Sequence, residues 1–199
     1  MTGAVARRTQ QERSEATVAL LVRGARELFG THGYANTSLD DITSQAGLSK
    51  GALYHHFPGK PELFGAVFAH EQQQLAAAVV DASRRKRDPW EAFFEGCRAF
   101  LERSLDPQVQ RITLIDAPAV LGWEQMRELE APHSNSVLAH AVRTAVEDGR
   151  LARRDPDVLA RLLLGAMCEG VALVAASENP KAAIRSVLAE LRLLLTPDA

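Results

Sequence analysis

The eight residues from Ser49 to His56, SKGALYHH, have the composition expected of a short helix that contacts nucleic acid. A lysine supplies positive charge, while a tyrosine and two histidines offer polar atoms for phosphates or base edges and rings that pack on sugars. A glycine followed by an alanine lets the start of the helix, with its unpaired main-chain N–H groups, approach a phosphate. The residues expected to make these contacts are Ser49, Lys50, Gly51, Ala52, Tyr54, His55 and His56.

Thr37 and Lys60 lie on either side of this segment and are expected to bind the phosphates that flank the contacted groove. Three other interpretations stay open: Tyr54 as a core tyrosine with a satisfied hydroxyl, His56 as a residue that only caps or packs at the helix end, and Lys60 as an ordinary surface lysine. A metal site at His55 and His56 is disfavoured, because neighbouring residues of a helix point about 100° apart and no further ligand lies close in sequence.

Start and stop signals predict a helix-turn-helix over about residues 37–56. Two pairs have the spacing of capping boxes, Thr9 with Glu12 and Ser38 with Asp41. Gly47 suits the left-handed turn between the two short helices that follow Ser38. Leu53 and Phe57 are four residues apart and are expected to pack in the core, on the side opposite the contact residues.

Beyond residue 60, helix signals recur. An Asp or Asn directly before a proline both caps a helix and places the proline where its missing N–H is harmless. With the apolar periodicity, this signal predicts helices near residues 61–83, 89–105, 107–115, 132–148, 156–177 and 180–195, with short or broken helices over 115–123. We therefore expect an all-α protein, with a three-helix DNA-binding head over residues 9–60 and a larger helical body over residues 61–199.

The segment from Thr37 to Leu63 closely resembles the N-terminal signature of TetR-family transcriptional repressors. The resemblance covers about residues 14–70. The matching elements are Thr37-Ser38, Asp41-Ile42, Ala46 to Gly51, Leu53-Tyr54, His56-Phe57, and Lys60 with Glu62-Leu63.

The resemblance implies a homodimer whose two heads occupy successive major grooves of a near-palindromic operator. It also implies a body that binds a small molecule and dimerises through its last two helices. By position, it assigns DNA contacts to the nine residues already named. At Ala52 many relatives carry a larger or polar residue, so we expect an apolar contact there, such as with a thymine methyl group.

The last two helices are expected to form the dimer interface and the body a ligand pocket. Apolar residues cover more than half of the circumference predicted for 156–177, which is typical of a helix that faces both its own core and a partner. The interface is predicted at Leu163, Met167, Gly170, Val174, Ile184, Val187, Leu188, Leu191 and Leu195. Burial of these residues inside a single chain is the alternative. A pocket needs apolar walls and a few polar groups, and it is predicted at Phe93, Phe94, Cys97, Phe100, Asp116, Trp123, Met126, Arg127 and Met167.

The charge distribution agrees with a DNA-binding end joined to a body that does not bind DNA. The net charge is −2, but residues 1–60 contain seven Lys and Arg against five acidic residues. The first residues lack the apolar segment of a signal peptide. No apolar run is expected to approach the roughly 20 residues of a membrane span, so a cytoplasmic protein is expected. Cys97 and Cys168 are expected to be buried thiols, and neither a metal nor a cofactor is expected.

Three classes of function follow from these features. A ligand-responsive transcriptional repressor agrees with most of them. An enzyme is disfavoured, because no Ser-His-Asp order, Gly-rich phosphate loop or paired-Cys metal motif occurs in a suitable context. A constitutive or architectural DNA-binding protein without a small-molecule effector is the alternative.

Overall fold

The computed structural model describes residues 9–196, and every regular element in that range is helical, which confirms the all-α prediction. The chain divides into two compact units, one ending at Val67 and the other starting at Phe68. This division lies within helix α4 (Lys60–Ser83). A functional boundary between residues 60 and 61 stays a prediction.

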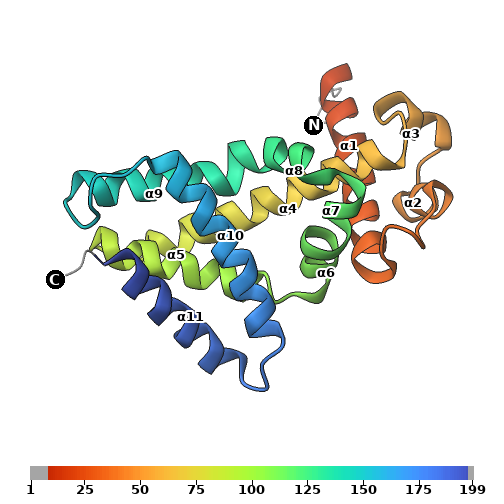
Figure 1. Ribbon diagram of the computed structural model, residues 1–199. Coiled ribbons are helices and arrows are strands. Elements are labelled where there is room, and N and C mark those ends of the chain that lie inside the picture. The colour runs from red at the N-terminus through yellow and green to blue at the C-terminus, as the bar shows by residue number, and fades with distance from the viewer. Residues whose placement is uncertain (1–8, 197–199) are drawn as a thin grey trace, which may run out of the picture. The chain divides into compact units, whose positions relative to one another are not determined.

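The first unit, the head, contains α1 (Gln10–His32), α2 (Leu39–Ala46), α3 (Lys50–His56) and the start of α4 (Figure 1). Both predicted capping boxes are present, at Thr9 and at Ser38, where each side chain satisfies a free N–H of the first helical turn. Gly47 ends α2 with a φ of 65°, in the left-handed region, so it makes the predicted sharp turn before α3. The helix-turn-helix is therefore confirmed.

Three aromatic rings stabilise the core of the head. The ring centroids of Phe29 and Phe64 are 5.2 Å apart, and the ring of Tyr34 lies 5.6 Å from Phe29 and 5.2 Å from Phe64. Phe29 and Phe64 are fully buried, together with Leu53 of α3. The ring contacts join α1 to the start of α4, while the burial of Leu53 turns one face of α3 inward.

The second unit, the body, starts with the rest of α4 and continues through short and long helices. They are α5 (Pro89–Arg103), α6 (Pro107–Gln110), η1 (Arg111–Asp116), α7 (Ala117–Val120), α8 (Gly122–Glu130), η2 (Ala131–Asn135), α9 (Ser136–Glu147), α10 (Pro156–Ala175) and α11 (Pro180–Leu195). Capping Asp or Asn residues precede the prolines that begin α5, α6, α10 and α11, as predicted.

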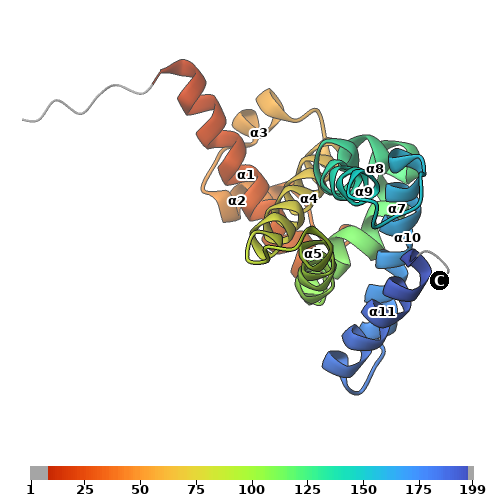
Figure 2. The ribbon, with the colours of Figure 1, turned by 90° about the vertical axis from the view of Figure 1, so that its left-hand side faces the viewer.

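The core of the body lies among α5, α9, α10 and α11. Leu101, Val109, Val142, Val171 and Val174 are buried there with the inner faces of α10 and α11. Figures 1 and 2 both show α11 turning back beside α10. At Gly170 an added Cβ atom would lie 3.0 Å from Val187 Cγ1, so the glycine permits the close approach of these two helices.

Two π-helical turns, η1 and η2, interrupt the middle of the body. The predicted helices over 107–115 and 132–148 therefore each consist of an α-helical and a π-helical part. Pro118 and Pro132, which cannot donate the N–H that a continuous α-helix requires, lie beside or within these turns. The expectation of broken helices in this region is confirmed.

Helix α10 corrects one expectation from the sequence. By length and composition it is apolar enough to cross a membrane, and 33% of that stretch is buried within the protein. Its exposed side carries Arg161 and Glu169 among apolar residues. Charges at these positions would be costly in the hydrocarbon core of a membrane, whereas a core helix of a globular protein also has this overall composition.

Candidate nucleic-acid interface and ligand cavity

Helix α3 presents one face to the core of the head and the opposite face to solvent. Its N-cap, Ser49, accepts a hydrogen bond from the Ala52 N–H at 3.2 Å. Leu53 is fully buried and Phe57 is 8% exposed, which confirms their predicted packing role. The outer face contains the exposed residues Ser49, Lys50, Gly51, Tyr54 and His55, with Ala52 and His56 half-buried at its edges.

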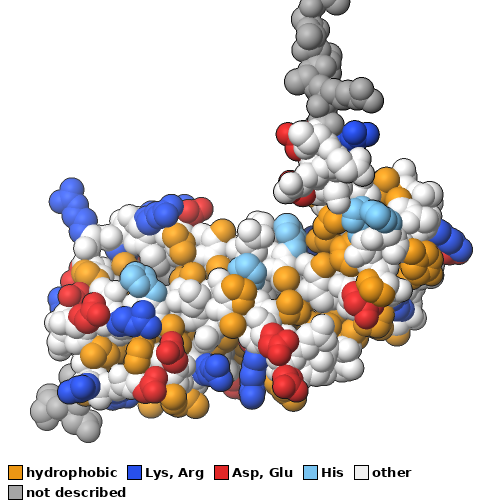
Figure 3. Space-filling view, turned by 90° about the horizontal axis from the view of Figure 1, so that it is seen from above, with side chains coloured by type: hydrophobic (Ala, Val, Ile, Leu, Met, Phe, Trp, Pro, Cys, Tyr) orange, Lys and Arg blue, Asp and Glu red, His pale blue; other side chains and the backbone are white. Residues whose placement is uncertain are grey.

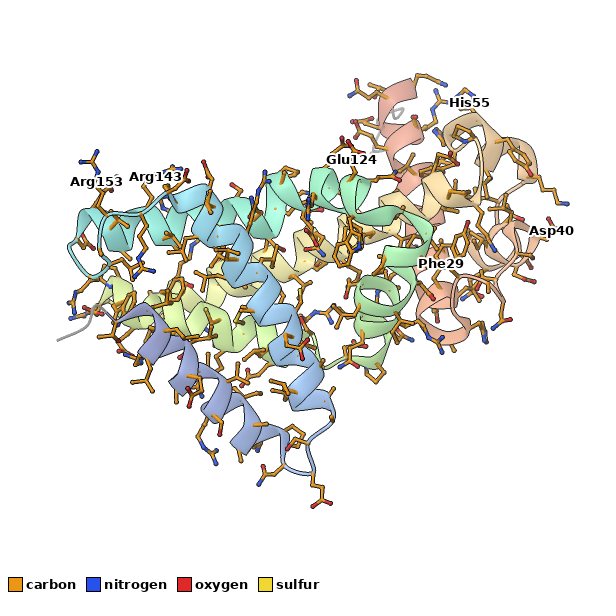
Figure 4. The ribbon with its side chains drawn as sticks, in the orientation of Figure 1. Phe29, Asp40, His55, Glu124, Arg143 and Arg153 are labelled. Carbon is orange, nitrogen blue, oxygen red and sulfur yellow. The ribbon has the colours of Figure 1, made fainter. Side chains whose placement is uncertain are left out.

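The side chain of Tyr54 is 56% exposed, which excludes the core-tyrosine interpretation. His55 and His56 lie edge to face, with ring centroids 4.9 Å apart. Figure 4 shows His55 on the outside of the head, whereas Phe29 points into it. Polar aromatic side chains exposed in this way are suited to contacts with phosphates, sugars and base edges.

Gly51 has no packing requirement within the head. A Cβ atom added there would meet only Ser49 Oγ, at 3.8 Å, which is ordinary contact. Glycine costs a helix about 1 kcal/mol relative to alanine. A glycine without an internal steric reason, on an exposed helix start, fits a close approach by another molecule.

Lys50 forms an ion pair with Asp40 of α2, with Nζ 2.7 Å from Oδ1. Both side chains are largely exposed, and Figure 4 shows Asp40 on the outside of the head. The hydrogen bond from Lys50 to Asp40, and then the charge of Asp40, raise the pKa of Lys50. An acidic residue, Asp40, therefore lies beside the predicted DNA contacts, although its pairing with Lys50 was not expected from the sequence.

Thr37 and Lys60, predicted to bind flanking phosphates, have partners inside the head. Thr37 is 3% exposed, and its hydroxyl donates to the main-chain oxygens of Gly33 at 2.9 Å and Leu28 at 3.3 Å. Lys60 Nζ donates to the main-chain oxygens of Tyr34 and Thr37. Both residues thus have a structural role in the free protein, and their contact with DNA stays a prediction.

The face of the molecule seen in Figure 3 has no broad surface of a single charge. On the face seen in Figure 3, Lys and Arg side chains of the described residues are interspersed with acidic ones. This agrees with the small charge asymmetry of the sequence, and it means that the shape and chemistry of α3, more than net charge, mark the candidate interface.

The body contains a cavity of about 60 Å³ that is lined by residues of α4, α5, η2, α9 and α10. Four of the predicted pocket residues line it, namely Phe93, Cys97, Phe100 and Met167. Burial raises the pKa of the Cys97 thiol to about 12, so this part of the wall is uncharged at neutral pH. Only Ser83 and Ser134 contribute hydroxyl groups to an otherwise apolar lining.

The other five predicted pocket residues do not line this cavity. Phe94 packs beneath the guanidinium of Arg192, 4.1 Å from ring centroid to Cζ, and so faces α11. Trp123 is 66% exposed, Arg127 is exposed, Asp116 is half-exposed, and Met126 is buried elsewhere. The last four residues belong to the broken middle segment, whose side chains the sequence could not place relative to the cavity.

Sequence reasoning missed the wall that α4 and η2 provide. From α4 come Ala76, Val79 and Ser83, and from η2 comes Ser134. The apolar positions of α4 were a usable signal for a buried face. The direction of Ser134 depends on a π-helical turn that no local pattern indicated.

The predicted dimer residues require a correction. Eight of the nine are buried within the body of a single chain, and Val187 packs against that core. They lie on the inner faces of α10 and α11, because those faces carry the most continuous apolar stripe. The outer faces expose other large apolar side chains, namely Val158, Leu162, Leu173, Leu193 and Leu194.

A helix-turn-helix head with an exposed recognition helix, joined to a helical body, defines a DNA-binding transcriptional regulator. Comparison with known families agrees. Residues 21–67 match the family described as bacterial regulatory proteins of the tetR family, and residues 90–197 match the tetracyclin repressor-like C-terminal domain. The chain therefore belongs to the TetR family of transcriptional regulators, and the predicted resemblance is confirmed.

Individual relatives cover most of the chain. The Transposon Tn10 TetC protein of Escherichia coli is 28% identical over 78% of this chain and 79% of its own length. The crystal structure of a TetR-family transcriptional regulator from Pectobacterium atrosepticum is 36% identical, with a TM-score of 0.76, over 96% of this chain and 99% of that one. RolR, solved in complex with resorcinol, shares the fold at 19% identity, with a TM-score of 0.72 over 94% and 90% of the two chains.

Proposed function

We propose that this protein is a homodimeric, ligand-responsive repressor that binds a near-palindromic operator in the cytoplasm. The observation that carries the proposal is the outer face of α3, where Lys50, Gly51, Tyr54 and His55 are exposed while Leu53 anchors the helix in the core. Such a helix fits the major groove, which is about 12 Å wide. Residues 49–56, with Thr37 and Lys60 beside them, are the proposed DNA contacts.

Dimerisation is supported by the outer faces of α10 and α11. Leu162, Leu173 and Leu194 are 67%, 58% and 72% exposed in the single chain. On α10 the exposed residues Gly165, Ala166 and Ala172 are small and would let a second helix approach. Two such faces from two chains would bury each other, and the resulting dimer would present two α3 helices to successive major grooves.

A small-molecule response is supported by the cavity in the body, which is largely apolar and partly lined by α4. RolR, a protein of the same fold, binds resorcinol. A ligand would release the operator by binding the non-DNA-binding state of the dimer more tightly than the DNA-binding state. Helix α4 belongs to both the head and the body and is the proposed link between them.

Selection of DNA from a random pool with purified full-length protein tests the proposal. We expect an inverted repeat bound by one dimer, with affinity that falls steeply as salt rises because two heads neutralise about 6–10 phosphates. A consensus without two-fold symmetry would contradict the homodimer. Retention of the operator in the presence of every compound that binds the body would favour a constitutive DNA-binding protein instead.

A further inference from the structure

The cavity in the body has a chemistry that restricts its ligand. Its walls are mostly apolar, with Val79, Phe93 and Met167 among them. They include one thiol and two hydroxyl groups, and no charged side chain is among the residues that line the cavity. Moving an ionised ligand from water into such a site would cost several kcal/mol without a partner charge to offset it. The cavity therefore selects an uncharged molecule.

The two hydroxyl groups in the wall have their protons directed away from the cavity. Ser83 Oγ donates to the main-chain oxygen of Ala92 at 3.0 Å, and Ser134 Oγ donates to Gln72 Oε1 at 2.7 Å. A serine hydroxyl has one proton and two lone pairs, so each of these groups can only accept a further hydrogen bond. At Ser83 this direction is set by a main-chain carbonyl, which cannot act as a donor. A matching ligand must supply the proton.

The small size of the cavity favours a small ligand. A dry cavity of about 150 Å³ in another protein binds benzene, whereas the cavity here measures about 60 Å³. Even one ring requires a wall to move. Met167 is the most adaptable wall residue, because its side chain is unbranched and flexible. The contact between α4 and α5 leaves less room for movement than the wall at Met167, since a Cβ atom on Gly96 would lie 2.8 Å from Ser83 Oγ.

We propose that the ligand of this cavity is a small, uncharged hydroxyl compound of the phenol class, whose O–H donates to Ser83 while its ring lies among the apolar walls. This inference rests on the proposed ligand-responsive function and names the chemistry of that site. Ser134, which lies in η2 and also lines the cavity, offers a second acceptor for a compound with two hydroxyls.

Calorimetric titration of the full-length protein with phenol, anisole and benzoate tests the proposal. We expect one phenol molecule to bind to each chain and to raise the Tm of the protein. Anisole has the same ring without the donor, and it should bind about tenfold more weakly, since one buried hydrogen bond contributes about that factor. Benzoate should not bind. Equal affinity for phenol and anisole, preference for benzoate, or no binding of phenol would each overturn the inference.

The variant Ser83→Ala separates recognition from simple cavity filling. It should remove most of the preference for phenol over anisole while leaving the affinity for anisole unchanged. Ser104→Ala is the control, because Ser104 is also a serine of the body, is itself buried, and does not line the cavity. A preference unchanged by Ser83→Ala would overturn the assignment.

Operator release, measured separately with labelled DNA, distinguishes this inference from the proposed function. If phenol binds with the stated preference but the operator stays bound, the cavity chemistry is upheld and the regulatory function fails. If the operator is bound normally but phenol does not bind, the inference about ligand class fails and the DNA-binding function stands.

Discussion

Lys60 donates a hydrogen bond from Nζ to the main-chain oxygen of Tyr34 at 2.9 Å, and the same ammonium lies 4.2 Å from the centroid of the Tyr34 ring. A second bond of 2.9 Å joins it to the main-chain oxygen of Thr37. Lys60 thereby ties the start of α4 to the loop between α1 and α2. A residue expected to clamp a phosphate is thus a structural element of the head.

Replacing Lys60 with methionine should destabilise the head. Lys60→Met keeps the aliphatic stem but removes the charge, leaving two main-chain oxygens without their donor. We expect a loss of about 2 kcal/mol in the free energy of unfolding, as for a hydrogen bond to a charged group, measured by urea denaturation. Lys86→Met is the control, since its ion pair with Glu95 is on the surface and contributes less than about 1 kcal/mol. If Lys60→Met keeps its stability but loses operator binding, the main role of Lys60 is the phosphate contact.

Neutralising Asp40 should strengthen DNA binding. Asp40→Asn frees Lys50 from its ion pair and removes a negative charge near the phosphates. We expect up to about fivefold tighter operator binding, corresponding to about 1 kcal/mol for an exposed pair, with a steeper salt dependence. Fluorescence anisotropy at several salt concentrations measures both. Asp81→Asn is the matched control, because Asp81 pairs with Arg84 in the body. Weaker binding by Asp40→Asn would mean that Asp40 positions Lys50 for contact.

Removing the ring of Tyr54 should weaken operator binding without affecting folding. The side chain is more than half exposed, so Tyr54→Ala removes little packing. We expect at least about a tenfold loss of affinity, equivalent to about 1.4 kcal/mol, with an unchanged Tm. Trp123→Ala, which removes an exposed aromatic ring from the body, should leave operator affinity unchanged. Wild-type affinity of Tyr54→Ala would exclude Tyr54 from the interface.

Charged residues on the outer faces of α10 and α11 should break the dimer. The double variant Leu162→Glu and Leu194→Glu places carboxylates where the proposed interface would bury them, at several kcal/mol each. We expect a folded monomer in sedimentation velocity and loss of operator binding. Ile115→Glu alters an equally exposed apolar residue outside these helices and should leave the dimer intact. If the double variant is still a dimer, the interface lies elsewhere on the chain.

Glu130 should make stability depend on pH. Burial raises the pKa of its carboxyl, an effect that Arg127 partly opposes. A carboxyl with a raised pKa in the folded state favours folding when protonated, and that contribution is lost as pH rises through the raised pKa. Glu130→Gln should therefore increase the free energy of unfolding at pH 7.5, by about 1.4 kcal/mol for each unit of pKa difference, and flatten its dependence above pH 4.5. Glu124→Gln, on the same helix but exposed (Figure 4), should change neither.

Local signals in the sequence were sufficient for the helices and for the outer face of α3. Capping boxes, the glycine after α2 and the Asp-Pro and Asn-Pro pairs act within a few residues, so their outcome does not depend on distant parts of the chain. The same is true of α3, where the four-residue spacing of Leu53 and Phe57 assigned the buried side and left the opposite side for contact.

The sequence was not sufficient wherever the partner of a side chain lies far away in the chain. The apolar stripe of α10 and α11 was assigned to a dimer, yet it packs within one chain, because periodicity shows that a face is buried but not against what.

The sequence by itself thus determined an all-α regulator with a helix-turn-helix, most of its helix starts and the exposed face of α3, since these follow from short-range backbone chemistry. Only the tertiary structure decided that Lys60 donates a hydrogen bond to Thr37 inside the head, that Asp40 pairs with Lys50, and that Ser83 and Ser134 line the same cavity. Those relationships join residues that are 10 to 51 positions apart, and they arise from the packing of helices that no local pattern encodes.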